Sequence, residues 1–114
     1  MKQRAAENYL KTHRKQSGLS QREMGKLLGY NSAGLVCRHE RSESIPTLEN
    51  ALAYEVIFGV PVAAIFVGLR NTIKHDVEHE LQQMETALGN RRVKNREANL
   101  IAQKLVWLNE RKSH

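Results

Sequence analysis

The sequence has a single cysteine, Cys37, among its 114 residues, so it cannot form an intrachain disulfide. This usage fits a reducing cytoplasm, where we expect the protein to work. No apolar run approaches the roughly 18 residues that indicate a membrane helix. Residues 1–15 are charged throughout and lack the apolar core of a signal peptide. We therefore expect no membrane segment.

Signals for β-strands are scarce as well. The β-branched residues are scattered, and no turn of the hairpin type separates two alternating runs. Hydrophobic residues make up 40% of the chain and charged residues 26%, which is ordinary for a globular protein. The length suits one domain with a modest core and an appendage. These features favour an all-α fold.

Positive charge is in excess. The formal net charge is +6 and the isoelectric point is about 9.8. Residues 1–70 contain ten Lys and Arg against six Asp and Glu, whereas residues 71–114 contain eight against six. This balance favours an anionic partner, either nucleic acid or a membrane surface, and the first part of the chain carries more of the surplus.

The most informative stretch is 18–40, which predicts two short helices joined by a tight turn. Ser20 and Glu23 have the spacing of a capping box, which opens a helix. Its apolar face is expected to contain Met24, Leu27 and Leu28. Gly29 ends this helix, because glycine adopts the left-handed conformation at little cost. The second glycine of the helix, Gly25, predicts close packing against the helix that follows.

The next helix is expected over about 32–41, with Ser32 as its N-cap. Val36 and His39 would be buried, and Leu35 or Ala33 would be partly covered. Two helices joined by a short turn that contains glycine form a helix-turn-helix, whose second helix can enter the DNA major groove.

Three further helices complete the predicted N-terminal domain, residues 1–68. Residues 3–16 have the pattern of a first helix. A helix over 48–58 follows its N-cap Thr47, and the Gly59–Pro61 break precedes a short helix over 62–67. The sequence therefore predicts a repressor-like bundle of five helices.

The remaining residues, 69–114, are predicted to form a helical C-terminal extension after a joint at 68–71. Apolar residues recur on one narrow stripe, and a second helix over about 92–111 follows the break at Gly89 and Asn90. Trp107 lies on that helix as a packing anchor or an interface hot spot. Apolar stripes must be covered, so the two helices pack on each other, on the first domain, or on a second copy of the chain. We favour a hairpin that dimerises or binds a protein partner. The stripe contains Ile73, Val77, Leu81, Met84 and Leu88.

Residues 7–67 resemble the repressor/Cro-type (XRE-like) helix-turn-helix domain. The resemblance rests on punctuating and apolar residues that agree with the family in order and spacing: Leu10, Arg14, the run Gly18-Leu19-Ser20-Gln21, Leu27-Leu28-Gly29, Val36 to Arg41, Pro46-Thr47-Leu48, and Phe58-Gly59-Val60-Pro61. It implies the same five-helix fold and double-stranded DNA as the partner. We expect no cofactor, no metal and no membrane partner. Residues 68–114 lie outside it.

The resemblance also implies roles for individual residues. Gln21 would touch a DNA phosphate, and Arg14 would form a structural ion pair with Glu40. One residue more than usual separates Gly29 from Glu40, so the register of base contacts stays open by about one position. The recognition helix and the turn before it would present six residues to DNA: Asn31, Ser32, Gly34, Leu35, Cys37 and Arg38.

The chemistry of these side chains leaves alternatives open. Arg38 can donate two hydrogen bonds to guanine or contact a phosphate. Asn31 and Ser32 are phosphate or base-edge contacts, helix caps, or both. Leu35 or Ala33 can touch a thymine methyl group. The cationic residues nearby are expected to neutralise phosphates, and these are Arg22, Lys26 and Arg41.

One other motif has the pattern of a metal site. His75, Glu78 and His79 match H-x-x-E-H, a zinc-peptidase pattern. A catalytic zinc needs a third ligand and a walled cleft, and only 35 residues follow the motif. We therefore expect a solvated helix face, no catalytic residue and no metal.

The sequence thus predicts a sequence-specific transcriptional regulator. It would bind a palindromic operator as a homodimer, and repression by occlusion is the simplest mechanism. The alternative is an antitoxin or other protein-interaction module with the same fold. An enzyme is not expected.

Overall fold

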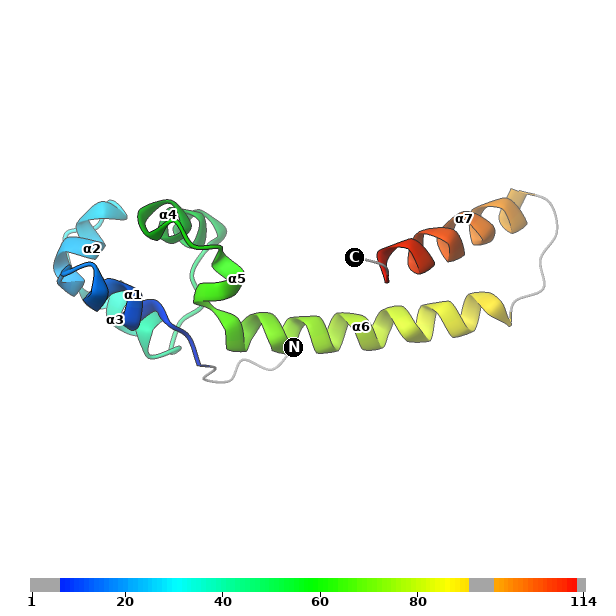
Figure 1. Cartoon of the computed structure of the whole chain (residues 1–114), viewed down its shortest axis with the longest axis horizontal. Helices are drawn as coiled ribbons and strands as arrows, with labels where there is room; N and C mark the ends of the chain where they lie inside the picture. The colour runs from blue at the N-terminus through cyan, green and yellow to red at the C-terminus, as the bar shows by residue number, and fades with distance from the viewer. Residues whose placement is uncertain (1–6, 91–95, 113–114) are drawn as a thin grey trace. The chain divides into compact units, whose positions relative to one another are not determined.

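A computed structural model describes residues 7–90 and 96–112. Within these residues there are helices and no strands, which confirms the all-α class. The chain divides into two compact units, Met1–Ile73 and Lys74–His114. Figure 1 labels the helices, which are α1 (Leu10–Gln16), α2 (Gln21–Leu27), α3 (Gly34–Glu40), α4 (Leu48–Phe58), α5 (Val62–Ile65), α6 (Val67–Gly89) and α7 (Arg96–Arg111).

The first helix starts later than its sequence pattern predicts. Residues 7–9 are not helical, and residues 3–6 lie outside the described residues. The backbone N–H of Tyr9 donates to the carbonyl of Ile65 at 2.7 Å, and the N–H of Leu10 donates to the Asn8 carboxamide at 3.0 Å. The bond from Tyr9 holds the segment against α5, so a contact between distant residues overrides the local helical pattern.

The core of the first unit is built from one or two side chains of each short helix. The buried apolar side chains are Leu10, Met24, Val36, Tyr54, Ile65 and Phe66. Leu28 packs against them, but Leu27 is 58% exposed, contrary to its expected place on the apolar face of α2. A helix of seven residues turns only a narrow side toward the core, and Met24 and Leu28 fill it.

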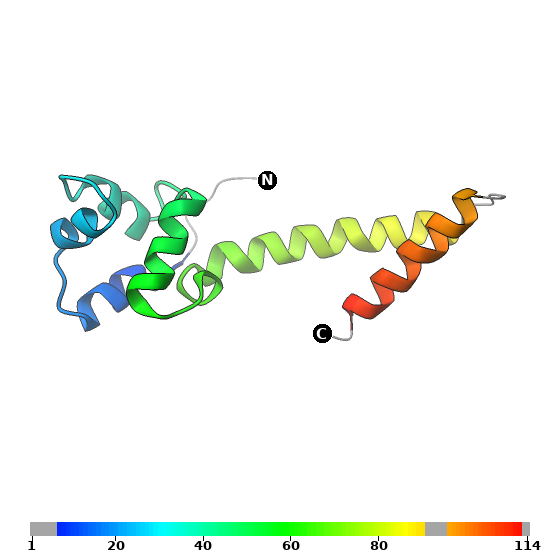
Figure 2. The same cartoon turned by 90° about the horizontal axis from the view of Figure 1, so that it is seen from above.

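The predicted joint at 68–71 is not a break between helices, because α6 runs through these residues without interruption (Figures 1 and 2). Gly68 stands in the first turn of α6, where its N–H donates to the carbonyl of Glu7 at 3.1 Å. A glycine in the first turn interrupts no established helical ladder, so it does not end the helix.

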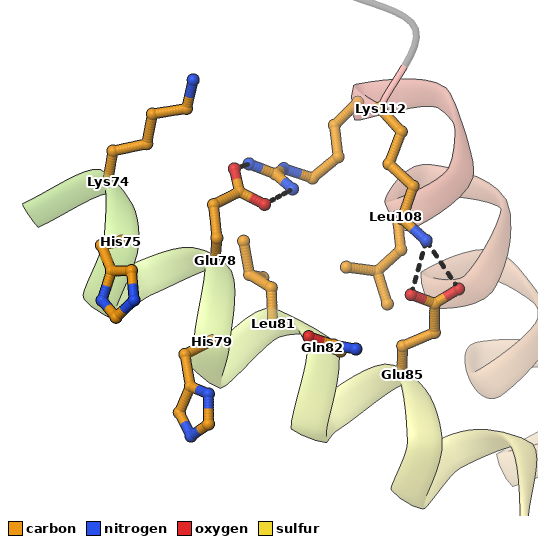
Figure 3. A pocket seen from close by; sticks show the side chains of 10 residues that line it. Lys74, His75, Glu78, His79, Leu81, Gln82, Glu85, Leu108 and Lys112 are labelled. Carbon is orange, nitrogen blue, oxygen red and sulfur yellow. Dashed lines mark hydrogen bonds and ion pairs between the residues drawn. The ribbon is translucent and has the colours of Figure 1, made fainter. Parts of the chain in front are cut away.

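In the second unit, α7 contacts α6 through side chains near its C-terminal end. Leu108 is the one buried hydrophobic residue among those described here. Arg111 pairs with Glu78 at 2.7 Å, and Lys112 pairs with Glu85 at 2.7 Å (Figure 3). These side chains line a cleft of about 510 Å³. The predicted start of the last helix at residue 92 lies outside the described residues, and α7 begins at Arg96.

None of the helices in the described residues combines the length and apolar character that a membrane span requires.

Trp107 is half exposed, so Leu108, rather than this tryptophan, anchors the contact inside the hairpin.

Candidate nucleic-acid interface

The N-terminus of α2 is closed by a capping box. The N–H of Glu23 donates to the Ser20 hydroxyl at 3.0 Å, and the N–H of Ser20 donates to the Glu23 carboxylate at 2.9 Å. The bond from the Ser20 backbone stabilises the ionised carboxylate and lowers the pKa of Glu23. The capping box fixes the first residue of α2, which is Gln21. It therefore fixes the backbone position from which the Gln21 side chain extends.

The turn between α2 and α3 crosses α2 at Gly25. A Cβ atom placed on this glycine would lie 2.3 Å from the carbonyl oxygen of Ser32, so a side chain there is excluded. The N–H of Tyr30 donates to the carbonyl of Gly25 at 2.8 Å. Gly29 has φ +93°, in the region that glycine adopts readily. The turn is therefore held at close range and sets the position of α3.

The recognition helix is shorter than predicted. It spans Gly34–Glu40 rather than about 32–41, and its N-cap is Ala33, without a side-chain cap. Ser32 is therefore not the N-cap. The reason is the turn itself: the Ser32 carbonyl is packed over Gly25, which leaves residues 31–33 in a bend and delays the first helical hydrogen bond, from Cys37 to Ala33.

One carboxylate joins the first three helices. The Arg14 guanidinium donates to Glu40 twice, at 2.5 Å through Nε and at 3.2 Å through Nη2. Gln21 donates its Nε2 to the same carboxylate at 3.0 Å, and Arg14 also donates to the carbonyl of Leu19 at 2.8 Å. The Arg14 and Glu40 side chains are 10% and 3% exposed. The bond to Glu40 raises the pKa of Arg14. The end of α3 is thereby tied to α1 and α2.

A second buried contact holds α3 from the other side. His39 Nδ1 lies 2.8 Å from the Tyr54 hydroxyl, and the ring is 1% exposed. Burial, followed by the charge of Arg38, lowers the pKa of His39, and burial raises the pKa of Tyr54. Among the described residues, His39 Nε2 has no hydrogen-bond partner. The structure thus confirms the predicted burial of Val36 and His39.

Sequence reasoning missed two positioning residues, Tyr54 and Asn8. The Asn8 side chain donates to the carbonyl of His39 and to the Ser42 hydroxyl, both at 3.0 Å. Asparagine favours turns and helix starts over helix interiors, and this preference is the local signal that a helix does not run through residue 8. No sequence signal links Tyr54 to His39, which lies on another helix.

The residues expected at DNA come from the start of α2, the turn before α3, and α3 with the residue that follows it. Six are exposed and three, Gln21, Leu35 and Cys37, are partly exposed. The guanidinium of Arg38 lies beside Gly34, with Nη1 3.7 Å from the place of a Cβ atom. Arg41 lies 3.9 Å from Glu43 in an exposed pair. The exposed six are Arg22, Asn31, Ser32, Gly34, Arg38 and Arg41.

The H-x-x-E-H residues have other partners. Glu78 accepts both hydrogen bonds of Arg111 (Figure 3), which lowers the pKa of Glu78. His79 lies 3.1 Å from the Gln83 amide. Within the part of the chain that the structure describes, no group of three His, Cys, Asp or Glu side chains has the placement to hold a metal ion.

Two helices joined by a turn, with a fixed inner side and a polar, cationic outer side, define a helix-turn-helix domain. Residues 10–65 match the family model described as helix-turn-helix, so this domain is a helix-turn-helix of the XRE type. The C-terminal part has no family match. No match was found among curated proteins or among solved structures.

The family assigns a general function. It is a family of DNA-binding regulatory domains and not of enzymes. The domain therefore identifies a DNA-binding transcription regulator of the XRE type.

Proposed function

We propose that the protein represses transcription by binding a palindromic operator as a homodimer, with α3 in the major groove. The observation that carries the proposal is the contrast between the two sides of α3. Val36 and His39 are buried and Glu40 is tied to Arg14, whereas Arg38 and the turn residues before it are exposed. A rigid inner side supports an outer side that can reach base edges.

The charges around α3 suit a duplex. Arg38 can donate two parallel hydrogen bonds to guanine O6 and N7. Arg22, Lys26 and Arg41 are exposed and can neutralise phosphates. Gln21, held by Glu40 at the start of α2, can donate to a phosphate as well. The contact to guanine selects a sequence, whereas the phosphate contacts position the domain on it.

A homodimer matches a palindrome. Two copies related by a two-fold axis would place their α3 helices in successive major grooves, about 34–36 Å apart. Repression then needs nothing more than occupancy of a promoter.

The test is selection of duplexes from a random-sequence pool by the full-length protein at two salt concentrations. We expect an enriched palindrome and an affinity that falls steeply as salt rises. Salt-sensitive binding without an enriched sequence would reduce the interface to a basic surface and contradict sequence-specific regulation.

A further inference from the structure

A small cavity lies at the C-terminal end of α3. Its volume is about 30 Å³. Its walls come from the segment before α1, the last turn of α3 with the loop that follows, and the junction of α5 and α6. A space of about 10–15 Å³ is enough for one water, so the cavity admits only groups of the size of one or two waters. Its polar walls include Glu7, His39 and Ser44, and its apolar walls include Ile45, Pro46 and Phe66.

His39 turns a hydrogen-bonding atom toward this cavity. The residue is 1% exposed, and its Nδ1 atom lies 2.8 Å from the Tyr54 hydroxyl. Tyr54 does not line the cavity, so the ring faces the cavity with its other side, which contains Nε2. Among the described residues, Nε2 has no hydrogen-bond partner. A buried polar atom without a partner is costly, so the cavity favours a ligand that can bond to Nε2.

The charges near the cavity favour a neutral ligand. Burial, followed by the charge of Arg38, lowers the pKa of His39, so the surroundings of this ring disfavour a second positive charge as well. An anion would meet the acidic side chain of Glu7 in the cavity wall. Either ion would also lose its hydration beside the buried ring of Phe66.

The hydrogen-bond chemistry of His39 narrows the ligand to a hydroxyl group. The Tyr54 hydroxyl can donate to Nδ1 or accept from it, so Nε2 is a donor in one tautomer and an acceptor in the other. A hydroxyl group can take either part, whereas an ammonium group only donates and a carboxylate only accepts. The Ser44 hydroxyl lines the same cavity and can share a second hydrogen bond with the ligand.

We propose that the cavity binds a neutral hydroxyl group, either a water or the hydroxyl of a small alcohol. Ile45, which is 48% exposed, and Pro46 also line the cavity and would contact the apolar part of such an alcohol. Because His39 belongs to α3, the ligand would act directly on the end of the recognition helix. The inference goes beyond DNA recognition, and none of its tests uses DNA.

The first experiment is NMR spectroscopy of the full-length protein with ¹⁵N-labelled histidine side chains at pH 8. Three probes of similar size differ in their polar group, namely ethanol, ethylammonium and acetate, and they are compared at equal ionic strength. We expect ethanol to shift the His39 resonances to saturation, with a Kd of about 1 mM or weaker, since a ligand of so few atoms cannot bind more tightly. Ethylammonium and acetate should cause no saturable shift. A saturable shift with either ion but not with ethanol would overturn the proposal.

A second measurement distinguishes water from an alcohol. Without a probe, a bound water should give a nuclear Overhauser effect between water and the ring protons of His39 and Phe66. Loss of this effect as ethanol is added would show that the two hydroxyl groups occupy one site. The effect without any response to ethanol would assign the site to water alone. Neither the effect nor a shift with ethanol would overturn the site.

Ser44→Val is the blocking variant, because it removes one hydroxyl and adds apolar atoms to the cavity wall. It should abolish the saturable shift of His39 with ethanol. Ser17→Val is the matched control, since Ser17 is exposed and does not line the cavity, and it should respond as the wild type does. Equal responses of Ser44→Val and the wild type would contradict the proposed site. The amide spectrum of each variant reports its fold, and the three probes on the wild type give an answer that needs no substitution.

Discussion

The Arg14 guanidinium and the Glu40 carboxylate form a buried ion pair between residues 26 positions apart in the chain. The pair joins α1 to the last residue of the recognition helix. Because both side chains are largely removed from water, each depends on the other to offset the cost of burying its charge.

Removal of the Glu40 carboxylate should therefore destabilise the domain. We expect Glu40→Ala to lower the free energy of unfolding by about 3 kcal/mol, because the Arg14 guanidinium is left buried without its partner. Urea denaturation followed by circular dichroism measures this change. Arg41→Ala serves as the control: its pair with Glu43 is exposed, and we expect a loss of less than about 0.5 kcal/mol. Equal losses in the two variants would contradict a structural role for the buried pair.

Gly25 should not tolerate a methyl group. The new Cβ atom of Gly25→Ala would lie 2.3 Å from the Ser32 carbonyl oxygen, so the turn must move. We expect the free energy of unfolding to fall by about 2 kcal/mol. Gly34→Ala is the matched control, because its Cβ atom would lie in ordinary contact at 3.7 Å, and alanine should stabilise the helix by about 0.5 kcal/mol. Thermal melts of both variants test the difference, and a stable Gly25→Ala would show that the turn can shift freely.

Arg38→Ala should weaken operator binding by about 1–3 kcal/mol and relax the preference at one base pair. The reason is the loss of a two-pronged contact to guanine, which other residues cannot replace. Binding titrations against the selected operator and against each single-base variant measure both effects. A uniform loss across all sequences would instead make Arg38 a phosphate contact.

Gln21→Ala should weaken binding evenly across DNA sequences, because a phosphate carries no sequence information. The same titrations, repeated at several salt concentrations, provide the measurement. The fold should persist, since Arg14 still holds Glu40. A changed base preference would be incompatible with a phosphate contact by Gln21.

Acid should destabilise the domain through His39. Burial lowers the pKa of this side chain in the folded state, whereas the unfolded chain has the ordinary value of about 6.5. As the pH falls through about 6.5, the unfolded state binds a proton that the folded state does not, so stability present at higher pH is lost. Urea unfolding between pH 8 and pH 5 should show this decline.

The variants are compared by the slope of the free energy of unfolding against pH rather than by its absolute value. Replacement of a buried residue also changes the free energy of unfolding at every pH. His39→Gln should flatten the pH dependence between pH 7 and pH 5. His75→Gln, at a side chain that is 84% exposed, should leave it as in the wild type. An unchanged slope in His39→Gln would assign the acid sensitivity to other groups.

Sequence reasoning worked best where neighbouring residues decide the structure. Ser20 and Glu23 form their capping box, Thr47 caps α4 by accepting from the Asn50 N–H, and Gly59 ends α4 at φ +66°. Each of these features depends on a few adjacent positions, so its signal is present in the local sequence.

Sequence reasoning failed where a distant contact decides. Ser32 has the chemistry of an N-cap, but the packing of its carbonyl over Gly25 moves the helix start to Gly34. The bond from Tyr9 to Ile65 delays α1 in the same way. For the candidate interface, the sequence named residues that are exposed or partly exposed, whereas the partners that hold α3 from behind, Asn8 and Tyr54, emerge only from the fold.

The bond between Gln21 and Glu40 has a consequence for the entropy of DNA binding. An ionised carboxylate only accepts hydrogen bonds, so the Gln21 amide must turn its nitrogen toward Glu40, as observed at 3.0 Å. One amide hydrogen is then engaged and the other is left in a fixed direction. Ordering a free glutamine on binding costs about 0.5–1.5 kcal/mol. A phosphate that accepts this second hydrogen would meet a side chain whose ordering was completed when the protein folded.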